Sequence, residues 1–288
     1  MNNKVLFVGD LHCKQEYVLP YVSKLVESQN VDKVVFLGDY VDDWNVPDKY
    51  VVRALDAQVA WYNEWCDKVE VVNLCGNHDW SYFHKDKYVA SGHRHCIERS
   101  VRYRLNKLNL QMSCVVDKYL VTHAGVTKKW LDSALPDVDL SDTHTLSDTL
   151  NLMYSNGDSL LNTCGSSRGG KDVAGPLWCD AYEDLKNMQG FGTSQIVGHS
   201  PVSCVCCNTN KDDTVTYVCD TMSLTRQGTP IGNSSMLLLD FESDAVLLPS
   251  IEHWDKIATS YHSYVTSLLF DDVVSTFKAE DVSQLWDF

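Results

Sequence analysis

The sequence contains no long apolar segment. No run approaches the roughly 18 consecutive apolar residues that a membrane-spanning helix requires. The first residues, MNNKVLFVGD, contain a short apolar run that is followed by an acidic residue. They lack the longer apolar core and the cleavage site of a secretory signal peptide. We therefore expect no membrane association, and a cytoplasmic protein.

Basic residues are in the minority. Lys and Arg total 24 against 39 Asp and Glu, which gives a formal net charge of −15. A chain of this charge does not broadly attract a nucleic-acid backbone, so extended nucleic-acid binding is not expected. Small or protein-borne substrates are favoured instead, and a bound metal ion could still attract an anionic substrate locally.

A set of two C-x-x-C motifs is also missing. The chain has an odd number of cysteines, 11, and is too large for a small disulfide scaffold, so we expect reduced thiols. Cys204, Cys206 and Cys207, with Cys219 further on, lack the paired C-x-x-C spacing of a zinc knuckle. We interpret these four residues as buried structural cysteines.

The first hundred residues alternate short Val-rich runs with longer amphipathic stretches. This pattern predicts strands at 5–8, 34–37 and 69–74, and helices at 16–28 and 48–66. Continuous apolar strands are typical of a parallel sheet covered by helices on both faces, and thus of an α/β fold. We expect one catalytic domain over 1–250 and a C-terminal extension over 251–288 that forms helices or extends to a partner.

A second group of segments follows. The basic, aromatic stretch 81–109 is interpreted as an insertion beside the functional site. Further strands are expected at 112–116, 119–122, 194–197, 215–219 and 236–239. Between them, 126–192 is expected to hold two or more helices and a Gly-rich loop at 165–175. The chain has no internal repeat.

The first three predicted strands each end in a polar cluster. These clusters are GDLH at 9–12, GDYVD at 38–42 and GNHD at 76–79, and THAG at 122–125 and GHSP at 198–201 follow later. Ligand sites of open α/β sheets gather at the carboxyl ends of the strands. One such cluster is commonly only a turn, but five in order predict carboxylates and imidazoles converging on divalent metal ions.

These motifs, read as GDLH, GDYVDDW, GNHD, THAG and GHSP, resemble those of the calcineurin-like metallophosphoesterases. The resemblance is strongest to the serine/threonine phosphoprotein phosphatase branch with its bacterial and phage relatives. It spans residues 9–201, with weaker similarity at 177–180. It implies a four-layer α/β fold, a central β-sandwich flanked by helices. It also implies two divalent metal ions, with manganese as the expected ion and iron or zinc as alternatives.

The resemblance also implies roles for individual residues. The metal ligands would be Asp10 and His12 for the first ion, Asp39 as a bridge, and Asn77, His123 and His199 for the second ion. His78 would protonate the leaving group, and Asp42 would orient its ring. We interpret Asp79 as a structural cap.

One position departs from the family pattern. Family phosphatases have an arginine that grips the substrate phosphate where this chain has Asp43, and a glycine where it has Trp44. An acid beside the phosphate predicts weaker binding of dianionic monoesters than of monoanionic diesters, unless Asp43 is turned away or neutralised by a cation such as Arg168. On this basis Asp43→Arg is expected to improve monoester hydrolysis.

The replacement cation is expected from a basic loop. Arg168, followed by two glycines that would let backbone amides approach a phosphate, is the preferred candidate. Lys171, Arg94 and His95 are the alternatives. His93 and His95 could also form another metal site, but an alternating pair in a basic loop is more often exposed.

The expected reaction is two-metal-dependent hydrolysis of a phosphomonoester, on a phosphoprotein or a nucleotide, by attack of a metal-bound hydroxide. No covalent intermediate is expected, because no Ser or Cys occupies a nucleophile position in the motifs. A phosphodiesterase or nucleoside-polyphosphate hydrolase is the alternative that Asp43 favours. A catalytically dead scaffold is a more remote alternative, because the motif residues are all present. The sequence carries no signal of oligomeric state.

Overall fold

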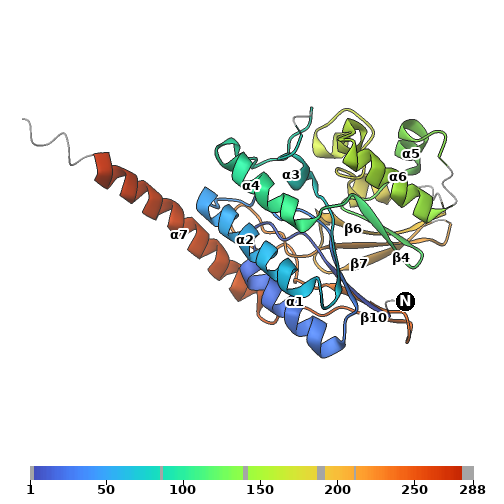
Figure 1. Ribbon diagram of the computed structural model, residues 1–288, viewed down its shortest axis with the longest axis horizontal. Helices are drawn as coiled ribbons and strands as arrows, with labels where there is room; N and C mark the ends of the chain where they lie inside the picture. Colours follow the sequence, from blue (N-terminus) through green and yellow to red (C-terminus); the bar gives the residue numbers. More distant parts are fainter. Residues whose placement is uncertain (1–2, 85–86, 139–141, 187–191, 211, 281–288) are drawn as a thin grey trace, which may run out of the picture.

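Two mixed five-stranded sheets pack face to face, and helices cover both outer faces (Figure 1). The computed structural model describes residues 3–84, 87–138, 142–186, 192–210 and 212–280, with side chains up to 269. The α/β fold with a central β-sandwich between helices, predicted from the sequence, is confirmed.

The first sheet has the strand order β10-β9-β1-β2-β3. Its strands are β1 (Lys4–Val8), β2 (Lys33–Phe36), β3 (Glu70–Asn73), β9 (Leu237–Asp240) and β10 (Ala245–Leu247). The first three strands run parallel, and β9 and β10 complete the sheet in antiparallel pairs. The carboxyl ends of β1, β2 and β3 therefore meet at one edge, as the βαβ pattern predicted.

The second sheet has the strand order β4-β5-β6-β8-β7. Its strands are β4 (Ser113–Val116), β5 (Tyr119–Thr122), β6 (Ser194–Pro201), β7 (Cys206–Thr209) and β8 (Val215–Asp220). Strands β5, β6 and β8 are parallel, while β4 and β7 pair antiparallel at the edges. The sequence did not predict β7 or β10, because both are short, largely exposed edge strands without a buried apolar run.

The cysteines of the β7 region are not all buried. Cys204 and Cys207 are exposed, Cys206 is half-buried, and only Cys219 on β8 lies in the core. The prediction of four buried cysteines is therefore wrong for Cys204 and Cys207. It failed because Cys207 lies on an edge strand with one face in solvent, and Cys204 lies in the bend before that strand.

The helices divide between the two outer faces. On the first sheet lie α1 (Gln15–Gln29), α2 (Asp48–Trp65), α4 (Glu98–Leu105) and the start of α7 (Trp254–Glu280); on the second lie α3 (Asn77–Trp80), α5 (Lys128–Ala134) and α6 (Thr143–Ser155). Short 3₁₀ turns occupy His95–Ile97, Asn106–Leu108, Ser159–Asn162 and Ser166–Arg168, and a π-helical turn occupies Ala181–Leu185. The segment 126–192 thus contains the expected helices, and the stretch 81–109 contains the helix α4, which the sequence did not predict. Residues 85–86, 139–141 and 187–191 lie outside the described residues.

Alternation along β1 joins the layers. Val5 and Phe7 point into the core between the two sheets, while Leu6 and Val8 point into the core beneath the helices. Both faces of the strand are therefore apolar, and this explains the continuous hydrophobic run in the sequence.

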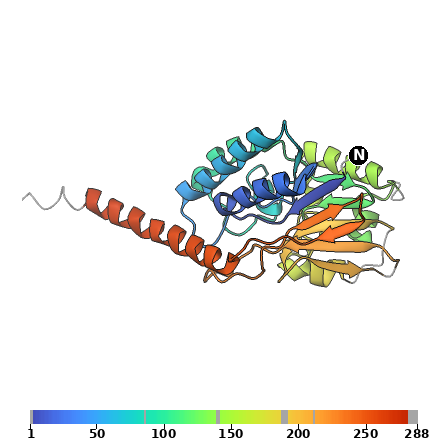
Figure 2. The same cartoon turned by 90° about the horizontal axis from the view of Figure 1, so that it is seen from below.

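The helix α7 begins in the core and then leaves it. Trp254, Ala258, Tyr261 and Val265 recur at helical spacing and are buried with residues of α1 and α2. Beyond them the helix extends away from the body of the protein (Figure 2). The helical part of the predicted extension is thus present, whereas 281–288 lie outside the described residues. No helix in the described part of the chain is long and apolar enough to cross a membrane.

Candidate metal centre

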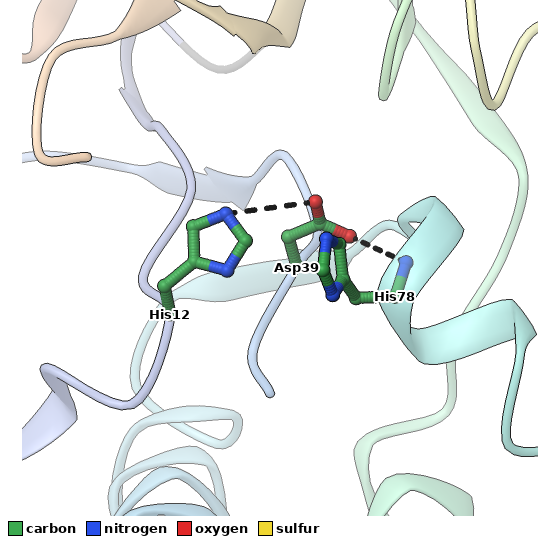
Figure 3. A group of neighbouring side chains, drawn as sticks. All are labelled: His12, Asp39 and His78. Atoms are coloured by element: carbon green, nitrogen blue, oxygen red, sulfur yellow. Dashed lines mark hydrogen bonds and ion pairs between the residues drawn. The ribbon is translucent and has the colours of Figure 1, made fainter. Parts of the chain in front are cut away.

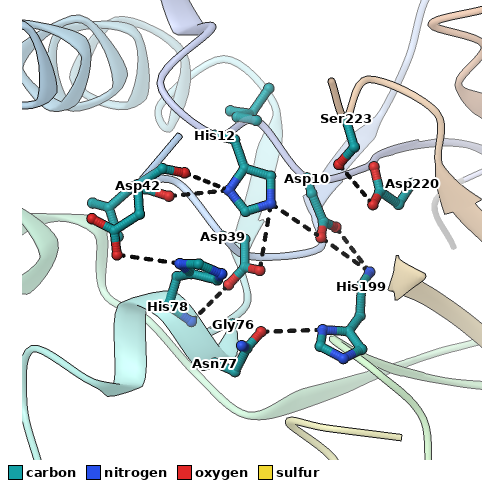
Figure 4. A network of polar contacts seen from close by, with 12 residues as sticks. Asp10, His12, Asp39, Asp42, Gly76, Asn77, His78, His199, Asp220 and Ser223 are labelled. Atoms are coloured by element: carbon teal, nitrogen blue, oxygen red, sulfur yellow. Dashed lines mark hydrogen bonds and ion pairs between the residues drawn. The ribbon is translucent and has the colours of Figure 1, made fainter. Parts of the chain in front are cut away.

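The predicted site residues converge at the carboxyl edge of both sheets (Figure 4). They are Asp10 and His12 after β1, Asp39 and Asp42 after β2, Asn77 and His78 in α3, His123 after β5, and His199 within β6. A pocket of about 440 Å³ opens over this group and is lined by His12, Asp39, Asn77, His78 and His199. Five segments that are far apart in the sequence thus form one site.

The backbone at this edge is bent in a way that side chains other than glycine rarely adopt. His12, Asp39 and His199 have φ values of +40°, +52° and +61°. Such conformations persist where the surrounding structure fixes them, often at functional sites. Close packing adds a requirement for glycine, since a Cβ atom on Gly76 would lie 2.0 Å from Asp39 Oδ1.

Asp79 fixes the loop that carries Asp39 through hydrogen bonds to its backbone. Its carboxylate accepts hydrogen bonds from the backbone N–H groups of Asp39 at 2.8 Å, Tyr40 at 3.1 Å and Gly76 at 2.9 Å. It is fully buried and points at the backbone, not into the pocket. This geometry agrees with the interpretation of Asp79 as a structural cap.

Three donor atoms on one side of the site lie at nearly equal distances. Asn77 Oδ1 is 3.0 Å from His123 Nε2 and 3.1 Å from His199 Nδ1, and the two nitrogens are 3.1 Å apart. Ligands at right angles around an ion, each about 2.1 Å from it, lie about 3.0 Å from one another. The spacing therefore suits a metal ion, with Asp39 Oδ2 on the other side at 3.5 Å from His123 Nε2.

Hydrogen bonds to the backbone orient two of the imidazoles. His12 Nδ1 lies 2.7 Å from the carbonyl oxygen of Asp42, and His123 Nδ1 lies 2.8 Å from that of Leu37. Nδ1 therefore carries the proton in each ring, and Nε2 keeps its lone pair. Nε2 of His12 lies 3.7 Å from Asp39 Oδ2 (Figure 3) and 3.9 Å from Asp10 Oδ2 (Figure 4).

The site contains several buried carboxyl groups close to one another. Burial, followed by the nearby charges of Asp220 and Asp39, raises the pKa of Asp10 well above its usual value. Asp220 Oδ1 is buried without a hydrogen-bond partner among the described residues. Buried carboxylates that repel one another, one of them with an unpartnered oxygen, are stabilised by bound dications. The residues present therefore fit divalent metal ions.

The sequence analysis missed Asp220. It directly follows the predicted strand 215–219, just as Asp10 and Asp39 follow β1 and β2, and Ser223 donates to its Oδ2 at 2.9 Å (Figure 4). The signal was the same aspartate at a strand end. It was overlooked because no glycine precedes it and no histidine follows it.

His78 lies between the carboxylates of Asp39 and Asp42 (Figure 4). Its Nδ1 lies 3.2 Å from Asp42 Oδ2, and its backbone N–H donates to Asp39 Oδ1 at 3.0 Å. Burial lowers the pKa of His78, but Asp39 and then Asp42 outweigh burial and raise it to about 9. Tyr82 donates to the other oxygen of Asp42 at 2.6 Å, which fixes that carboxylate. The ring is thus held in the protonated form that a proton donor requires.

Asp43 has a cation partner, and the partner is Lys14. Lys14 Nζ lies 2.8 Å from Asp43 Oδ2, and the Tyr261 hydroxyl donates to the same oxygen at 3.0 Å. The side chains of Lys14 and Asp43 are only 1% and 6% exposed. The sequence analysis allowed for neutralisation of Asp43 but named Arg168 as the example.

Arg168 lines the pocket but is already paired. Its Nε lies 2.9 Å from Asp180 Oδ2, and Nη2 donates to Ser200 Oγ at 3.0 Å. The amides of Gly169 and Gly170 donate to carbonyl oxygens of their own loop, so they do not face a phosphate as the sequence suggested. The alternatives Lys171, Arg94 and His95 do not line the pocket, whereas Arg226, which the sequence analysis missed, does.

Part of the stretch 81–109 lies beside the site. Ser91 and Gly92 line the pocket, and Arg94 pairs with Asp48 at 2.8 Å. Donor atoms of His93, His95 and Glu98 lie within 4.8 Å of one another, although Glu98 also pairs with Arg102. His95 is exposed, in agreement with the interpretation of this pair as surface residues, but both ring nitrogens of His93 are buried, so the interpretation is wrong for His93.

The sequence of residues 3–224 matches the family model described as calcineurin-like phosphoesterase. The chain belongs to this family. The phosphoesterase is accordingly a hydrolase. No curated protein sequence matches it significantly.

Solved structures similar to this phosphoesterase come from different organisms. A protein serine/threonine phosphatase of Saccharomyces cerevisiae is 11% identical with a TM-score of 0.47, over 88% of this chain and 81% of that chain. A protein of Pyrococcus horikoshii OT3 is 11% identical with a TM-score of 0.46, over 92% and 97%. A metallophosphoesterase of Sphaerobacter thermophilus is 10% identical with a TM-score of 0.39, over 93% and 98%.

Proposed function

We propose that this phosphoesterase hydrolyses a phosphomonoester, carried by a phosphoprotein or a nucleotide, with the help of two divalent metal ions. The convergence of six ligand residues with the His78–Asp42 pair at one pocket supports this proposal most strongly. A binding protein without catalysis would have no use for a buried, oriented proton donor beside such a ligand set.

The ligand residues divide into two groups with Asp39 between them. Asp10 and His12 would hold the first ion, and Asn77, His123 and His199 the second, with Asp39 shared. Bound dications would neutralise the phosphate charge and lower the pKa of a water molecule. Manganese is the ion we propose, because it suits the carboxylate oxygens of Asp10 and Asp39, and iron or zinc, which imidazole suits, are the alternatives.

His78 would donate the proton that the leaving oxygen needs. Its ring lies in the pocket wall, and Asp42 fixes it through Nδ1, so Nε2 is the atom that would face the substrate. A donor of this kind accelerates hydrolysis by about 10²–10⁴-fold. Asp42 would keep the ring charged until the proton is transferred.

The partner of Asp43 bears on the choice between monoesters and diesters. An uncompensated acid near the phosphate would favour monoanionic diesters, and this was the argument for a diesterase or polyphosphate hydrolase. Lys14 carries the opposite charge 2.8 Å from that acid. The pair adds little net repulsion, so a dianionic monoester is the substrate that we favour.

The test is hydrolysis of a substrate panel by the purified protein with Mn²⁺, Fe²⁺ or Zn²⁺. The panel contains an aryl monophosphate, a phosphoprotein, nucleotides, a cyclic nucleotide, an aryl diester and a dinucleoside polyphosphate. We expect the highest kcat/KM on monoesters and complete loss after chelation. A diester or polyphosphate as the best substrate would contradict the proposed specificity, and no hydrolysis with any ion would contradict the activity.

A further inference from the structure

Arg226 is a cation at the pocket whose charge no carboxylate offsets among the described residues. It lies in the loop between β8 and β9, lines the pocket and is exposed to solvent. The other arginine of the pocket, Arg168, is bound to Asp180 at 2.9 Å. In a chain with a net charge of −15, an unneutralised arginine beside a phosphate site can supply attraction that the rest of the surface does not.

The residues after Asp43 hold Arg226 in place. The guanidinium carbon lies 5.9 Å from the centre of the Trp44 ring, within cation–π range. The side-chain amide of Asn45 donates to the backbone carbonyl of Arg226 at 3.2 Å. The segment that lacks the family arginine therefore contacts another arginine, supplied by a distant loop.

The Arg226 loop is also fixed on its other side. A tight turn closes it, with Gly228 N–H donating to the Thr225 carbonyl at 2.8 Å and Thr225 N–H donating to the Thr229 carbonyl at 2.9 Å. Gly228 has φ +82° and packs on α7, where a Cβ atom would lie 2.2 Å from His262. The Arg226 loop is thus in contact with Asn45 on one side and with α7 on the other. These contacts fix the backbone of the loop without a substrate.

We propose that Arg226 binds the dianionic phosphate of the substrate, in place of the arginine that the family carries at the position of Asp43. This inference rests on the proposed phosphomonoesterase function. A guanidinium group can donate two parallel hydrogen bonds to phosphate oxygens, a geometry that lysine cannot reproduce. The Trp44 ring contacts the guanidinium group and holds it at the pocket. Trp44 is therefore a positioning residue.

The relation between Trp44 and Arg226 also accounts for the paired change in the motif. An arginine at position 43 would compete with Lys14 for space and charge, whereas the aspartate at this position binds Lys14. With the motif arginine gone, phosphate recognition requires a cation from elsewhere in the pocket. Of the two pocket arginines, Arg226 keeps all its guanidinium donors available, because no hydrogen bond or ion pair of that group occurs among the described residues.

The test compares Arg226→Gln, Arg226→Lys and Trp44→Ala with the wild type in KM and kcat for an aryl monophosphate, and in Ki for inorganic phosphate. Arg226→Gln is expected to raise KM and Ki at least about tenfold, the cost of losing a charged hydrogen bond, with a smaller change in kcat. Arg226→Lys should recover part of the loss. Trp44→Ala should raise KM less than Arg226→Gln, and Trp44→Phe should restore it.

The matched control is Arg99→Gln, which removes the same charge from an exposed position on α4 outside the pocket. It is expected to leave KM and Ki unchanged. If Arg226→Gln also leaves both constants at wild-type values in an active enzyme, the role of Arg226 is refuted while the proposed function stands. If the wild type hydrolyses no monoester but inorganic phosphate still binds in an Arg226-dependent way, the proposed function fails and the anion site remains.

Discussion

Lys14 Nζ and Asp43 Oδ2 lie 2.8 Å apart, with both side chains almost fully buried. Lys14 also donates to the backbone carbonyl of His12 at 3.1 Å, so this ion pair is connected directly to a proposed metal ligand. Tyr261 on α7 donates to Asp43 at 3.0 Å and reaches the same carbonyl at 3.4 Å. The acid that replaces the family arginine therefore belongs to a buried network beneath the site.

Removing the charge of Asp43 should destabilise the protein. Asp43→Asn leaves the buried Lys14 ammonium without its counterion, and breaking a buried pair in this way typically costs about 3–5 kcal/mol. The measurement is the free energy of unfolding from urea denaturation. The double variant Lys14→Met/Asp43→Asn should be more stable than Asp43→Asn, because it removes the orphaned charge as well. Equal stability of wild type and Asp43→Asn would show that the ion pair does not form.

The same contact reverses a prediction made from the sequence. Asp43→Arg, expected from the motif alone to improve monoester hydrolysis, would place a second cation against buried Lys14. We now expect this variant to unfold at lower urea concentration and to gain no monoester efficiency.

The hydrogen bond from the Tyr261 hydroxyl on α7 to Asp43 should stabilise the folded protein. Tyr261→Phe keeps the ring and removes the donor to Asp43, so we expect a loss of about 1–3 kcal/mol in the free energy of unfolding, the range for a hydrogen bond to a charged group. Thermal denaturation of the full chain measures it. Tyr103→Phe, at an exposed position on α4, is the control and should change nothing. A wild-type melting temperature for Tyr261→Phe would exclude this role of α7.

His78→Asn tests the proton donor. We expect kcat to fall about 10²–10⁴-fold on an alkyl monophosphate with KM nearly unchanged. An activated aryl phosphate, whose leaving group needs no proton, should lose much less. Steady-state kinetics on both substrates measures this difference. An equal loss on the two would assign His78 a different role.

Asp42 should set the pH range of activity. The carboxylates of Asp39 and Asp42 raise the pKa of His78 to about 9, so the ring is protonated below that pH and loses its proton as the pH rises through it. Asp42→Asn removes part of that effect and lowers the pKa. The alkaline limb of the kcat profile should therefore move to lower pH. A limb that stays in place or moves upward would contradict the pairing of Asp42 with His78.

The sequence predicted the elements that form the site better than it predicted the sheet edges. Val-rich strands such as β1 and β2 are buried on both faces, so their apolar runs are visible in the sequence. Strands β7 and β10 are edge strands with exposed faces, and no apolar run marks them. The five motifs converge because the carboxyl ends of parallel strands share an edge.

Contacts between distant loops could not be predicted from sequence. The pair Lys14–Asp43 depends on the bend after β1, and the contact of Trp44 with Arg226 joins segments 182 positions apart, the difference between 226 and 44. In both pairs the two residues are too far apart in the sequence to form a recognisable motif. Asp220 was missed for a different reason, since its place at a strand end was visible in the sequence but no glycine precedes it and no histidine follows it.

The metal content of the wild type and Asp39→Asn tests the central claim most directly. Asp39 lies between the two ligand groups, 3.7 Å from His12 Nε2 and 3.5 Å from His123 Nε2, so its charge would shield two dications from each other. After loading with Mn²⁺ and desalting, elemental analysis should find two ions per wild-type chain and a loss of both in Asp39→Asn, together with a loss of monoester hydrolysis. An Asp39→Asn protein that retains two ions and near-normal turnover would contradict the assignment of the metal centre.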